Sequence, residues 1–187
     1  PLTVLRVDRT HEICVVEMGM NHPGEIAALA HVAAPEVGVV TAVGTAHRGF
    51  FAKGRDIAIA KAELLDGLVG QQLAVVNRDT PFFGVVSSHA GKRLITFGTC
   101  RGADCRGIIR SVGERDFSFG VEGESQEFFM RFWNPAWIYA GLAGIAVARE
   151  FGIPAAHVAE VLASFSPIAG RGLIVDAGGV SVVDESY

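Results

Sequence analysis

The sequence predicts an α/β fold in which helices flank a mostly parallel β-sheet, with a small antiparallel section at about residues 101–132. Three observations predict this fold. Valine-rich apolar runs alternate with helical periodicity in the first half of the chain, the middle alternates apolar and polar residues, and helical periodicity then returns. Because half of the 187 residues are hydrophobic, the chain can bury one sizeable core, and we expect a single domain over 1–187.

Four short strands are expected in the first half, because continuous apolar runs are typical of strands buried on both faces of a parallel sheet. These strands are 13–19, 37–44, 72–77 and 93–98. Helices are predicted between them at 23–34, 57–68 and 80–91. Pro23 and Glu25 suit the start of the first helix, since proline fixes a helical φ and an acidic side chain favours the first turn.

The second half begins with alternating residues and two turn signals, at 112–116 and 121–125, which predict two or three antiparallel strands. Helical periodicity then predicts helices at 134–152 and 155–165. The chain ends with a predicted hairpin across 177–179.

The composition excludes several functions. The formal net charge of −4 is spread over intermixed signs, so binding to a nucleic-acid backbone is not expected. No apolar stretch is long enough to span a membrane and no signal peptide is recognisable, so we expect a soluble, cytoplasmic protein. The three cysteines include no CxxC pair, which argues against a disulfide framework or a zinc site, and Cys14 is expected in the core.

Both ends of the sequence look cut. The first residues carry no start signal of their own, and the last residues stop where a parallel strand would deliver a functional loop. We therefore expect the chain to be a piece of a larger enzyme.

Polar side chains follow three of the predicted strands, where ligands gather in an open α/β sheet. They are Glu17 with Asn21 and His22, then His47, and finally Asp184 with Ser186 and Tyr187. Each has an ordinary alternative role, as a helix cap, a loop histidine bonded to the backbone, or a turn residue. Together with Lys61, however, a carboxylate and an imidazole at neighbouring strand ends suit a divalent cation beside a phosphate.

Lys61 lies in the middle of the apolar face of the helix predicted at 57–68. Such a lysine usually extends its ammonium to water or pairs with an acid, here Glu63 or Asp66. If it is buried and unpaired, desolvation favours the neutral amine. A neutral amine can add CO₂, and the resulting carbamate can ligate magnesium where an ammonium cannot.

The motifs VVEMGMNHPGEI, GTAHRGFF, IAKAELLDGL, NRD, GRG and VVDESY resemble, in this order, those of the central ATPase domain of the Mur ligase family. The resemblance covers nearly the whole chain and is greatest to the MurF branch. Its most specific parts are the E-x-G-x-N-x-x-G-E-I stretch, the lysine in A-K-x-E, and the D-x-S-Y ending.

The resemblance implies ATP and two Mg²⁺ ions as cofactors. Glu17 matches the acidic residue that helps to hold one magnesium between the ATP phosphates. His47 and Lys61, the latter carbamylated, match the ligands of a second magnesium that stabilises an acyl phosphate. These three residues are the implied catalytic and metal-binding set.

The resemblance also implies nucleotide-binding residues. Asn21 and His22 match the loop beside the metals, and Asn134 matches an asparagine near the adenine. Arg171 resembles an arginine that reaches the nucleotide, and Asp184 begins the segment that leads to a C-terminal domain.

The chain departs from the family at several positions. Trp133 and Trp137 stand where MurF proteins usually have His and Asn, and Arg48-Gly49 replaces Leu-Glu. No G-x-x-x-x-G-K-[ST] loop occurs, because Gly91-Lys92 has Val86 in place of the first glycine. The resemblance implies that this phosphate loop and the first strand lie upstream, and that the N-terminal UDP-binding and C-terminal domains are absent.

The function implied is that of a fragment of an ATP-dependent amide ligase in peptidoglycan precursor synthesis. ATP would phosphorylate the carboxylate of a UDP-MurNAc-peptide, and D-alanyl-D-alanine would attack the acyl phosphate. The isolated chain is expected to be inactive. Two alternatives stay open: a folylpolyglutamate or cyanophycin synthetase with the same ATPase core, and a catalytically inactive nucleotide-binding module, for which Trp133, Trp137 and Arg48 are the support.

Overall fold

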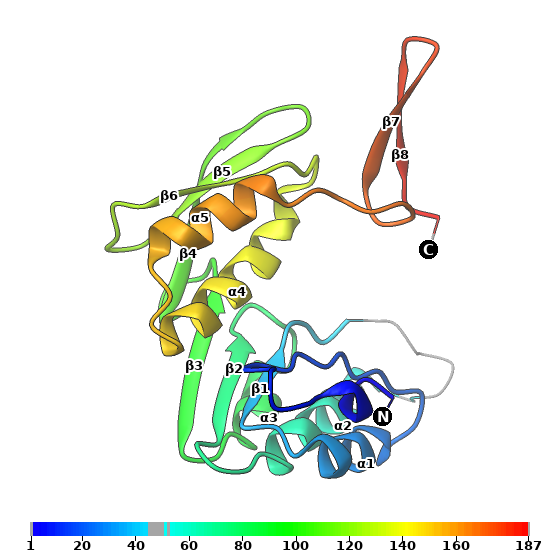
Figure 1. Cartoon of the computed structure of the whole chain (residues 1–187), viewed down its shortest axis with the longest axis vertical. Helices are drawn as coiled ribbons and strands as arrows, with labels where there is room; N and C mark the ends of the chain where they lie inside the picture. Colours follow the sequence, from blue (N-terminus) through cyan, green and yellow to red (C-terminus); the bar gives the residue numbers. More distant parts are fainter. Residues whose placement is uncertain (1, 45–50, 52, 187) are drawn as a thin grey trace. The chain divides into compact units, whose positions relative to one another are not determined.

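The computed structural model describes residues 2–44, 51 and 53–186. The chain forms two compact units, residues 1–96 and 97–187, and their boundary falls inside strand β3 (Arg93–Gly98). The first unit contains the alternating helices and strands, and the second contains the antiparallel section and the C-terminal helices (Figure 1). Whether both belong to one domain over 1–187 stays a prediction.

The described residues of the first unit form three α-helices beside the strands of a parallel sheet. Its elements are η1 (Val4–Arg6), α1 (Glu25–Ala33), β1 (Val37–Val40), α2 (Gly54–Asp66), β2 (Leu73–Asn77), α3 (Phe83–Ser87) and β3. Strands β1 and β2 pair in parallel, with Val37 opposite Leu73 and Val40 opposite Val76. All five residues of β2 are buried, which confirms the prediction of a strand covered on both faces.

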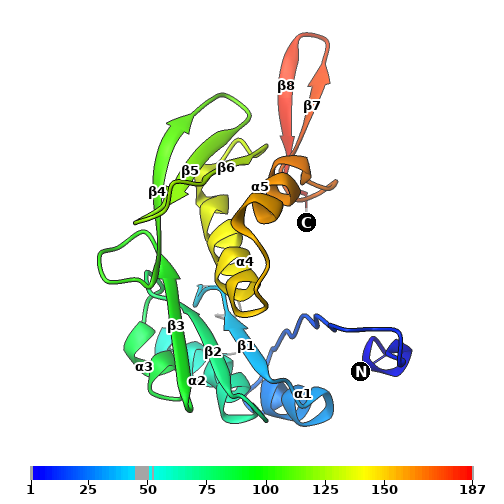
Figure 2. The same ribbon diagram turned by 60° about the vertical axis from the view of Figure 1, so that its left-hand side comes forward.

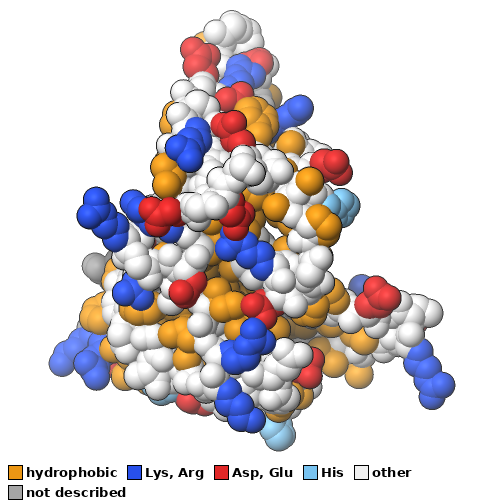
Figure 3. Space-filling model, turned by 90° about the vertical axis from the view of Figure 1, so that its left-hand side faces the viewer, with side chains coloured by type: hydrophobic (Ala, Val, Ile, Leu, Met, Phe, Trp, Pro, Cys, Tyr) orange, Lys and Arg blue, Asp and Glu red, His pale blue; other side chains and the backbone are white. Residues whose placement is uncertain are grey.

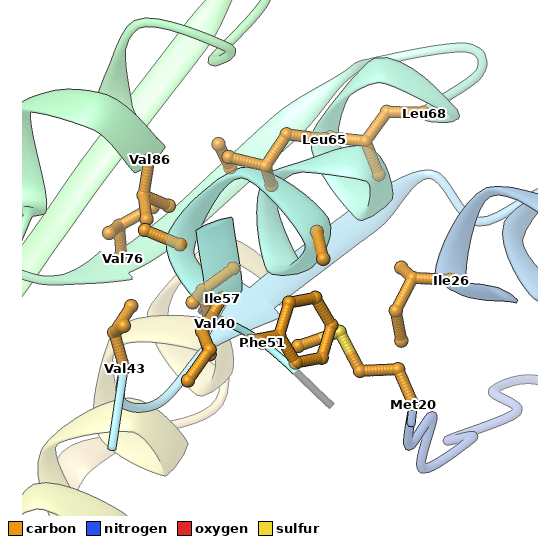
Figure 4. Close-up of a cluster of buried hydrophobic side chains, with 13 residues drawn as sticks. Met20, Ile26, Val40, Val43, Phe51, Ile57, Leu65, Leu68, Val76 and Val86 are labelled. Atoms are coloured by element: carbon orange, nitrogen blue, oxygen red, sulfur yellow. The ribbon is translucent and has the colours of Figure 1, made fainter. Parts of the chain in front are cut away.

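The core of the first unit lies where α2 packs on the strands. Ile57 and Leu65 of α2, Val40 of β1 and Val76 of β2 belong to one buried cluster (Figure 4). Helix α2 approaches β1 closely at Gly38, where an added Cβ would lie 3.1 Å from Cδ2 of Leu65. A larger side chain there would push the helix away from the sheet.

The segment 13–19 is not a strand, so this prediction was wrong. It belongs to no sheet in the described part of the chain, and Val15 is 87% exposed. Apolar residues form a buried strand only where neighbouring strands supply hydrogen bonds and both faces are covered. Cys14 is likewise exposed instead of packed in the core.

Two other elements are shorter than predicted. Strand β1 ends at Val40, and α3 ends at Ser87, well before Gly91. After β1 the chain is held by side chains in place of a strand ladder. The Asn77 amide donates to the Thr41 carbonyl over 2.8 Å, and the Thr80 hydroxyl accepts from Val43 N–H over 2.5 Å.

The second unit contains a three-stranded antiparallel section, as predicted, followed by two helices and a hairpin. Its elements are β4 (Cys105–Val112), β5 (Phe117–Val121), β6 (Glu127–Met130), η2 (Pro135–Trp137), α4 (Ile138–Glu150), α5 (Ala155–Ser164), β7 (Leu173–Ala177) and β8 (Val180–Asp184). The predicted hairpin is confirmed. Gly178 and Gly179 form its turn with φ of 60° and 87°, values that favour glycine.

Aromatic side chains form the core of the second unit. Phe119 is fully buried and stacks on Phe117 and Phe128, with ring centroids 5.9 and 5.4 Å apart. Helix α4 lies against this section (Figure 2), and an added Cβ at Gly141 would lie only 2.9 Å from the Phe119 ring.

The predicted fold class is confirmed. Strands are hydrogen-bonded in the order β1-β2-β3-β4-β5-β6, with β1–β2 and β3–β4 parallel and β4–β5–β6 antiparallel, while β7 and β8 form a separate sheet.

The surface charge and the helix lengths bear on the composition of the chain. On the face drawn in Figure 3, lysine and arginine side chains are interspersed with acidic ones. No helix in the described part of the chain combines the length and apolar composition needed to cross a membrane. The cytoplasmic location stays a prediction.

Candidate functional site

Lys61 is half-buried on α2, between the fully buried Ala60 and Ala62. Burial lowers the pKa of its ammonium, because the charged form loses hydration. No hydrogen bond or ion pair engages Lys61 among the described residues. The side chain is therefore desolvated without compensation from an acid in the described structure.

The two acids considered as partners of Lys61 are bonded elsewhere. Glu63 accepts hydrogen bonds from the backbone of α1 and of the residue preceding it, and Asp66 pairs with Nδ1 of His89 at 2.9 Å. Residues two apart on a helix do not face each other, which explains why Glu63 is not available to Lys61. The ordinary role of Lys61 as half of a helix ion pair is therefore wrong.

Asn21 and His22 form the turn that leads into α1. Glu25 closes this turn, because its Oε2 accepts Asn21 N–H over 2.6 Å and its Oε1 lies 3.1 Å from Nδ1 of His22. Hydrogen bonds hold the pKa of the Glu25 carboxyl below its ordinary value. The bond from the Asn21 backbone has the largest effect, and the backbone and side-chain bonds from His22 follow. The turn is thus locally fixed, with the side chains of both residues exposed.

Glu17 is exposed on the irregular segment that precedes this turn. Met18 and Met20 on the same segment pack on the core of the first unit, and Met20 lies beside Phe51 (Figure 4). Because methionines that pack on the core alternate with exposed residues, the methionines fix this segment on the core of the first unit. Glu17 does not cap α1, as the ordinary alternative proposed, because Glu63 occupies that position.

His47 lies outside the described residues, so its predicted position stays a prediction. The chain before it is held by Asn77 and Thr80, which are both buried and bond to the segment after β1. Sequence reasoning did not give these two residues a role. The signal available was the NRD motif, which begins at Asn77.

Three of the residues predicted to bind the nucleotide, Asn134, Arg171 and Asp184, lie in the second unit. Asn134 caps η2, with its Oδ1 accepting Ala136 N–H over 2.9 Å. Trp133 and Trp137, which come before and after Asn134 in the sequence, approach Gly172. An added Cβ at Gly172 would lie 3.6 Å from Nε1 of Trp133 and 3.9 Å from Nε1 of Trp137. The neighbourhood of Asn134 therefore meets the loop that contains Arg171.

Asp184 closes the same loop from the end of β8. Its Oδ2 accepts Gly170 N–H and its backbone carbonyl accepts Gly172 N–H, each over 2.8 Å. The Ser186 hydroxyl and the backbone N–H groups of Gly170 and Ser186 hold the pKa of the Asp184 carboxyl below its usual value. The structure thus gathers the surroundings of three predicted residues that are distant in sequence, and Asp184 also has its ordinary role as a turn residue.

Two members of the metal-binding set that the resemblance implies, Glu17 and Lys61, lie among the described residues. Glu17 offers a carboxylate with no hydrogen bond or ion pair among the described residues, and Lys61 offers an amine that becomes an oxygen ligand once carbamylated. No group of three or more His, Cys, Asp and Glu side chains within the described ranges is arranged to hold a metal. The set of Glu17, His47 and a carbamylated Lys61 therefore stays a prediction.

Described residues of the first unit line a larger and a smaller surface hollow. The larger, of about 540 Å³, lies between α1 and α2 and contains no predicted site residue. The smaller, of about 270 Å³, contains Glu17 and the apolar side chains of the N-terminal segment and α1. Of these two hollows, the smaller one includes a predicted site residue.

Comparison with known proteins identifies a matching family. Residues 1–148 match the model of the Mur ligase middle domain. UDP-N-acetylmuramoyl-tripeptide–D-alanyl-D-alanine ligases of Mycobacterium bovis and Bacillus subtilis are 31% and 30% identical to the chain over its whole length. The chain spans only 38% and 40% of these two relatives.

Solved structures give the same fold. MurF from Acinetobacter baumannii superimposes with a TM-score of 0.89 at 23% identity, covering 98% of this chain and 41% of that one. The MurF ligase from Thermotoga maritima, solved in complex with ADP, has a TM-score of 0.74 at 26% identity over 88% of this chain and 38% of that one.

Proposed function

Because the chain belongs to the Mur ligase family through its middle domain, we propose that it is the central ATPase part of a MurF-type ligase. The relatives that it matches over its full length are named as ligases that join D-alanyl-D-alanine to a UDP-N-acetylmuramoyl-tripeptide. The chain spans about two fifths of their length. We therefore assign the complete reaction to a longer protein that contains these residues.

The observation that supports this function best is the environment of Lys61. The amine lies on the packed side of α2 and has neither Glu63 nor Asp66 as a partner. In its neutral form the nitrogen attacks the carbon of CO₂, forming an N–C bond, and the nitrogen releases one proton. The product is a carbamate anion with two oxygens.

Glu17, His47 and the Lys61 carbamate are the proposed metal ligands. Glu17 supports this role by its exposed carboxylate, and the methionines beside it fix its segment on the core. When bound, magnesium would neutralise charge on the transferring phosphoryl group and on the acyl phosphate. Asn21 and His22 would border these ions from the turn before α1.

Asn134, Arg171 and Asp184 are the proposed nucleotide residues of the second unit. Asp184 is already bonded to the loop at Gly170–Gly172, so we assign it the task of holding Arg171 in place. Asn134 retains its amide nitrogen as a donor while its oxygen caps η2. The ADP complex of the T. maritima MurF supports ATP as the cosubstrate.

The proposed reaction has two steps. The carboxylate of the UDP-MurNAc-tripeptide attacks the γ-phosphorus of ATP, releasing ADP and forming an acyl phosphate. The amine of D-alanyl-D-alanine then attacks the acyl carbon, an amide bond forms, and inorganic phosphate leaves with the amine proton released to solvent. We place this reaction in the cytoplasm, where ATP and UDP-activated sugars are made.

The open alternatives make different predictions for the amine acceptor. A folylpolyglutamate or cyanophycin type would release phosphate with an amino acid acceptor and not with D-alanyl-D-alanine. An inactive nucleotide-binding module would bind MgATP and release no phosphate with any acceptor. The full-length relatives of the chain favour the D-alanyl-D-alanine reaction.

The test is phosphate release by the longer protein with ATP, UDP-MurNAc-tripeptide and D-alanyl-D-alanine. Release that requires all three supports the proposal, and Lys61→Ala is expected to lower it at least a thousandfold, on the order of other losses of an essential catalytic group. Lys92→Ala is the matched control, because Lys92 is an exposed loop lysine in the same unit. Release without D-alanyl-D-alanine dependence contradicts the proposal.

The isolated chain gives a second test. The 187 residues contain no phosphate-binding loop motif, so we expect no release above background from them alone. Turnover by this chain with both substrates would contradict the assignment to a central part.

A further inference from the structure

Glu63 makes a contact that the proposed chemistry does not use. Its Oε1 accepts Gly24 N–H over 2.8 Å and its Oε2 accepts Ala27 N–H over 3.1 Å. These donors belong to the start of α1, and Glu63 belongs to α2. Both carboxylate oxygens are thus committed to the backbone of another helix.

Helix α1 needs this contact because it lacks a cap of its own. Its N-cap residue is Gly24, which has φ of 86° and no side chain to accept a hydrogen bond. The first backbone N–H groups of a helix have no partner within the helix, and a carboxylate there also interacts favourably with the helix dipole. Glu63 supplies from α2 what Gly24 cannot supply.

The same contact closes the turn that contains Asn21 and His22. Glu25 holds the beginning of this turn through the N–H groups of Asn21 and His22, at 2.6 and 3.2 Å. Glu63 holds its end at Gly24. Glu25 is local to the turn, whereas Glu63 is the carboxylate that ties it to the helix of Lys61.

We propose that Glu63 is a positioning residue that sets the turn 21–24 in register with α2 and so fixes Asn21 and His22 relative to Lys61. The proposal rests on the proposed function, because it gives that register a purpose at the metal site. Glu63 lies two residues from Lys61 on one rigid helix, so a shift at Gly24 changes the geometry between the turn and Lys61 directly.

Loss of Glu63 is not expected to separate the two helices. They also pack through Ala30 and Gly67, where an added Cβ on Gly67 would lie 2.7 Å from Cβ of Ala30. Glu63→Ala should therefore fold and release only the turn. A variant at Glu63 therefore reports on the position of the turn 21–24.

The experiment titrates Mn²⁺, as a paramagnetic substitute for Mg²⁺, into the longer protein with ATP and follows water proton relaxation. Glu63→Ala is expected to weaken Mn²⁺ binding about tenfold, as for residues that orient metal ligands without touching the metal. Glu63→Gln, whose amide oxygen can still accept one N–H bond, should recover most of the affinity. Asp66→Ala is the matched control, since it removes a carboxylate contact from the same helix without touching the turn.

Hydrogen exchange at 21–27 supplies the second measurement. Faster exchange together with the weakened Mn²⁺ binding supports the proposal. Faster exchange with Mn²⁺ affinity equal to that of Asp66→Ala overturns it and leaves Glu63 as a helix cap only. Because neither measurement needs turnover, failure of the ligase assay would reject the proposed function without deciding the role of Glu63, which these two results decide.

Discussion

Arg115, in the turn between β4 and β5, donates two hydrogen bonds to Asp176 of β7, with distances of 2.6 and 3.1 Å to the two carboxylate oxygens. The same guanidinium donates to the Ser181 hydroxyl of β8 over 2.7 Å. An isolated two-stranded hairpin is only marginally stable in water. These three hydrogen bonds therefore tie both strands of the hairpin to the antiparallel section.

Replacement of Arg115 by alanine should loosen the hairpin selectively. We expect amide exchange over 173–184 to accelerate several-fold, because a planar guanidinium fork cannot be replaced by water with the same geometry. Hydrogen exchange followed by mass spectrometry measures this effect. Arg101→Ala, an exposed arginine of the same unit, is the control, and equal exchange in the two variants would contradict the role of Arg115.

The same contact should depend on acid pH. The Arg115 hydrogen bonds lower the pKa of the Asp176 carboxyl from its ordinary 3.8. A carboxyl whose pKa is lower in the folded chain than in the unfolded chain stabilises the folded form at pH values above its ordinary pKa. This contribution is lost as the pH falls through the pKa of the folded form. We expect the protection of 173–184 to be constant above pH 5 and to fall below pH 3.8, with the fall absent in Arg115→Ala.

Replacement of Lys61 by methionine should stabilise the protein while abolishing activity. Methionine occupies the space of the lysine stem without the partly desolvated ammonium, and we expect a gain in the free energy of unfolding within the range of about 0.5–2 kcal/mol that is usual for stabilising substitutions. Chemical denaturation without metal and CO₂ measures the gain. The pKa of Lys61 in the folded chain is lowered from 10.5, so near and above pH 10.5 the folded and unfolded chains both carry a neutral amine. The gain in stability should therefore shrink as the pH rises toward that value. A loss of stability would contradict the uncompensated burial of Lys61.

Phe119 should be the most sensitive aromatic position in the antiparallel section. Its ring is fully buried and stacks on two neighbours, so Phe119→Ala is expected to cost about 3–5 kcal/mol in the free energy of unfolding. Phe129→Ala, on the neighbouring strand with 37% of the residue exposed, should cost about 1 kcal/mol or less. Similar losses in the two variants would disagree with the observed core.

Substitutions of Asn134 should separate capping from nucleotide binding. Asn134→Asp keeps the oxygen that accepts Ala136 N–H but loses the amide donor, so it should preserve the unfolding midpoint and weaken MgADP binding about tenfold. Asn134→Ala should lose both. Calorimetric titration with MgADP and thermal denaturation distinguish the two effects, and unchanged ADP binding in Asn134→Asp would remove Asn134 from the nucleotide site.

The sequence alone determined the elements whose partners lie nearby in the chain. Strand β2, the three strands of the antiparallel section and the hairpin follow from local alternation and turn residues, and Lys61 stands out because helical period places it on an apolar face. The same local reasoning failed at 13–19, because burial of an apolar run depends on neighbours that no local pattern specifies. Only the tertiary structure decided which side-chain acceptor meets which donor. The contacts of Glu63 with Gly24, of Thr80 with Val43 and of Arg115 with Asp176 join residues 39, 37 and 61 positions apart, and such pairings depend on how the helices and strands pack.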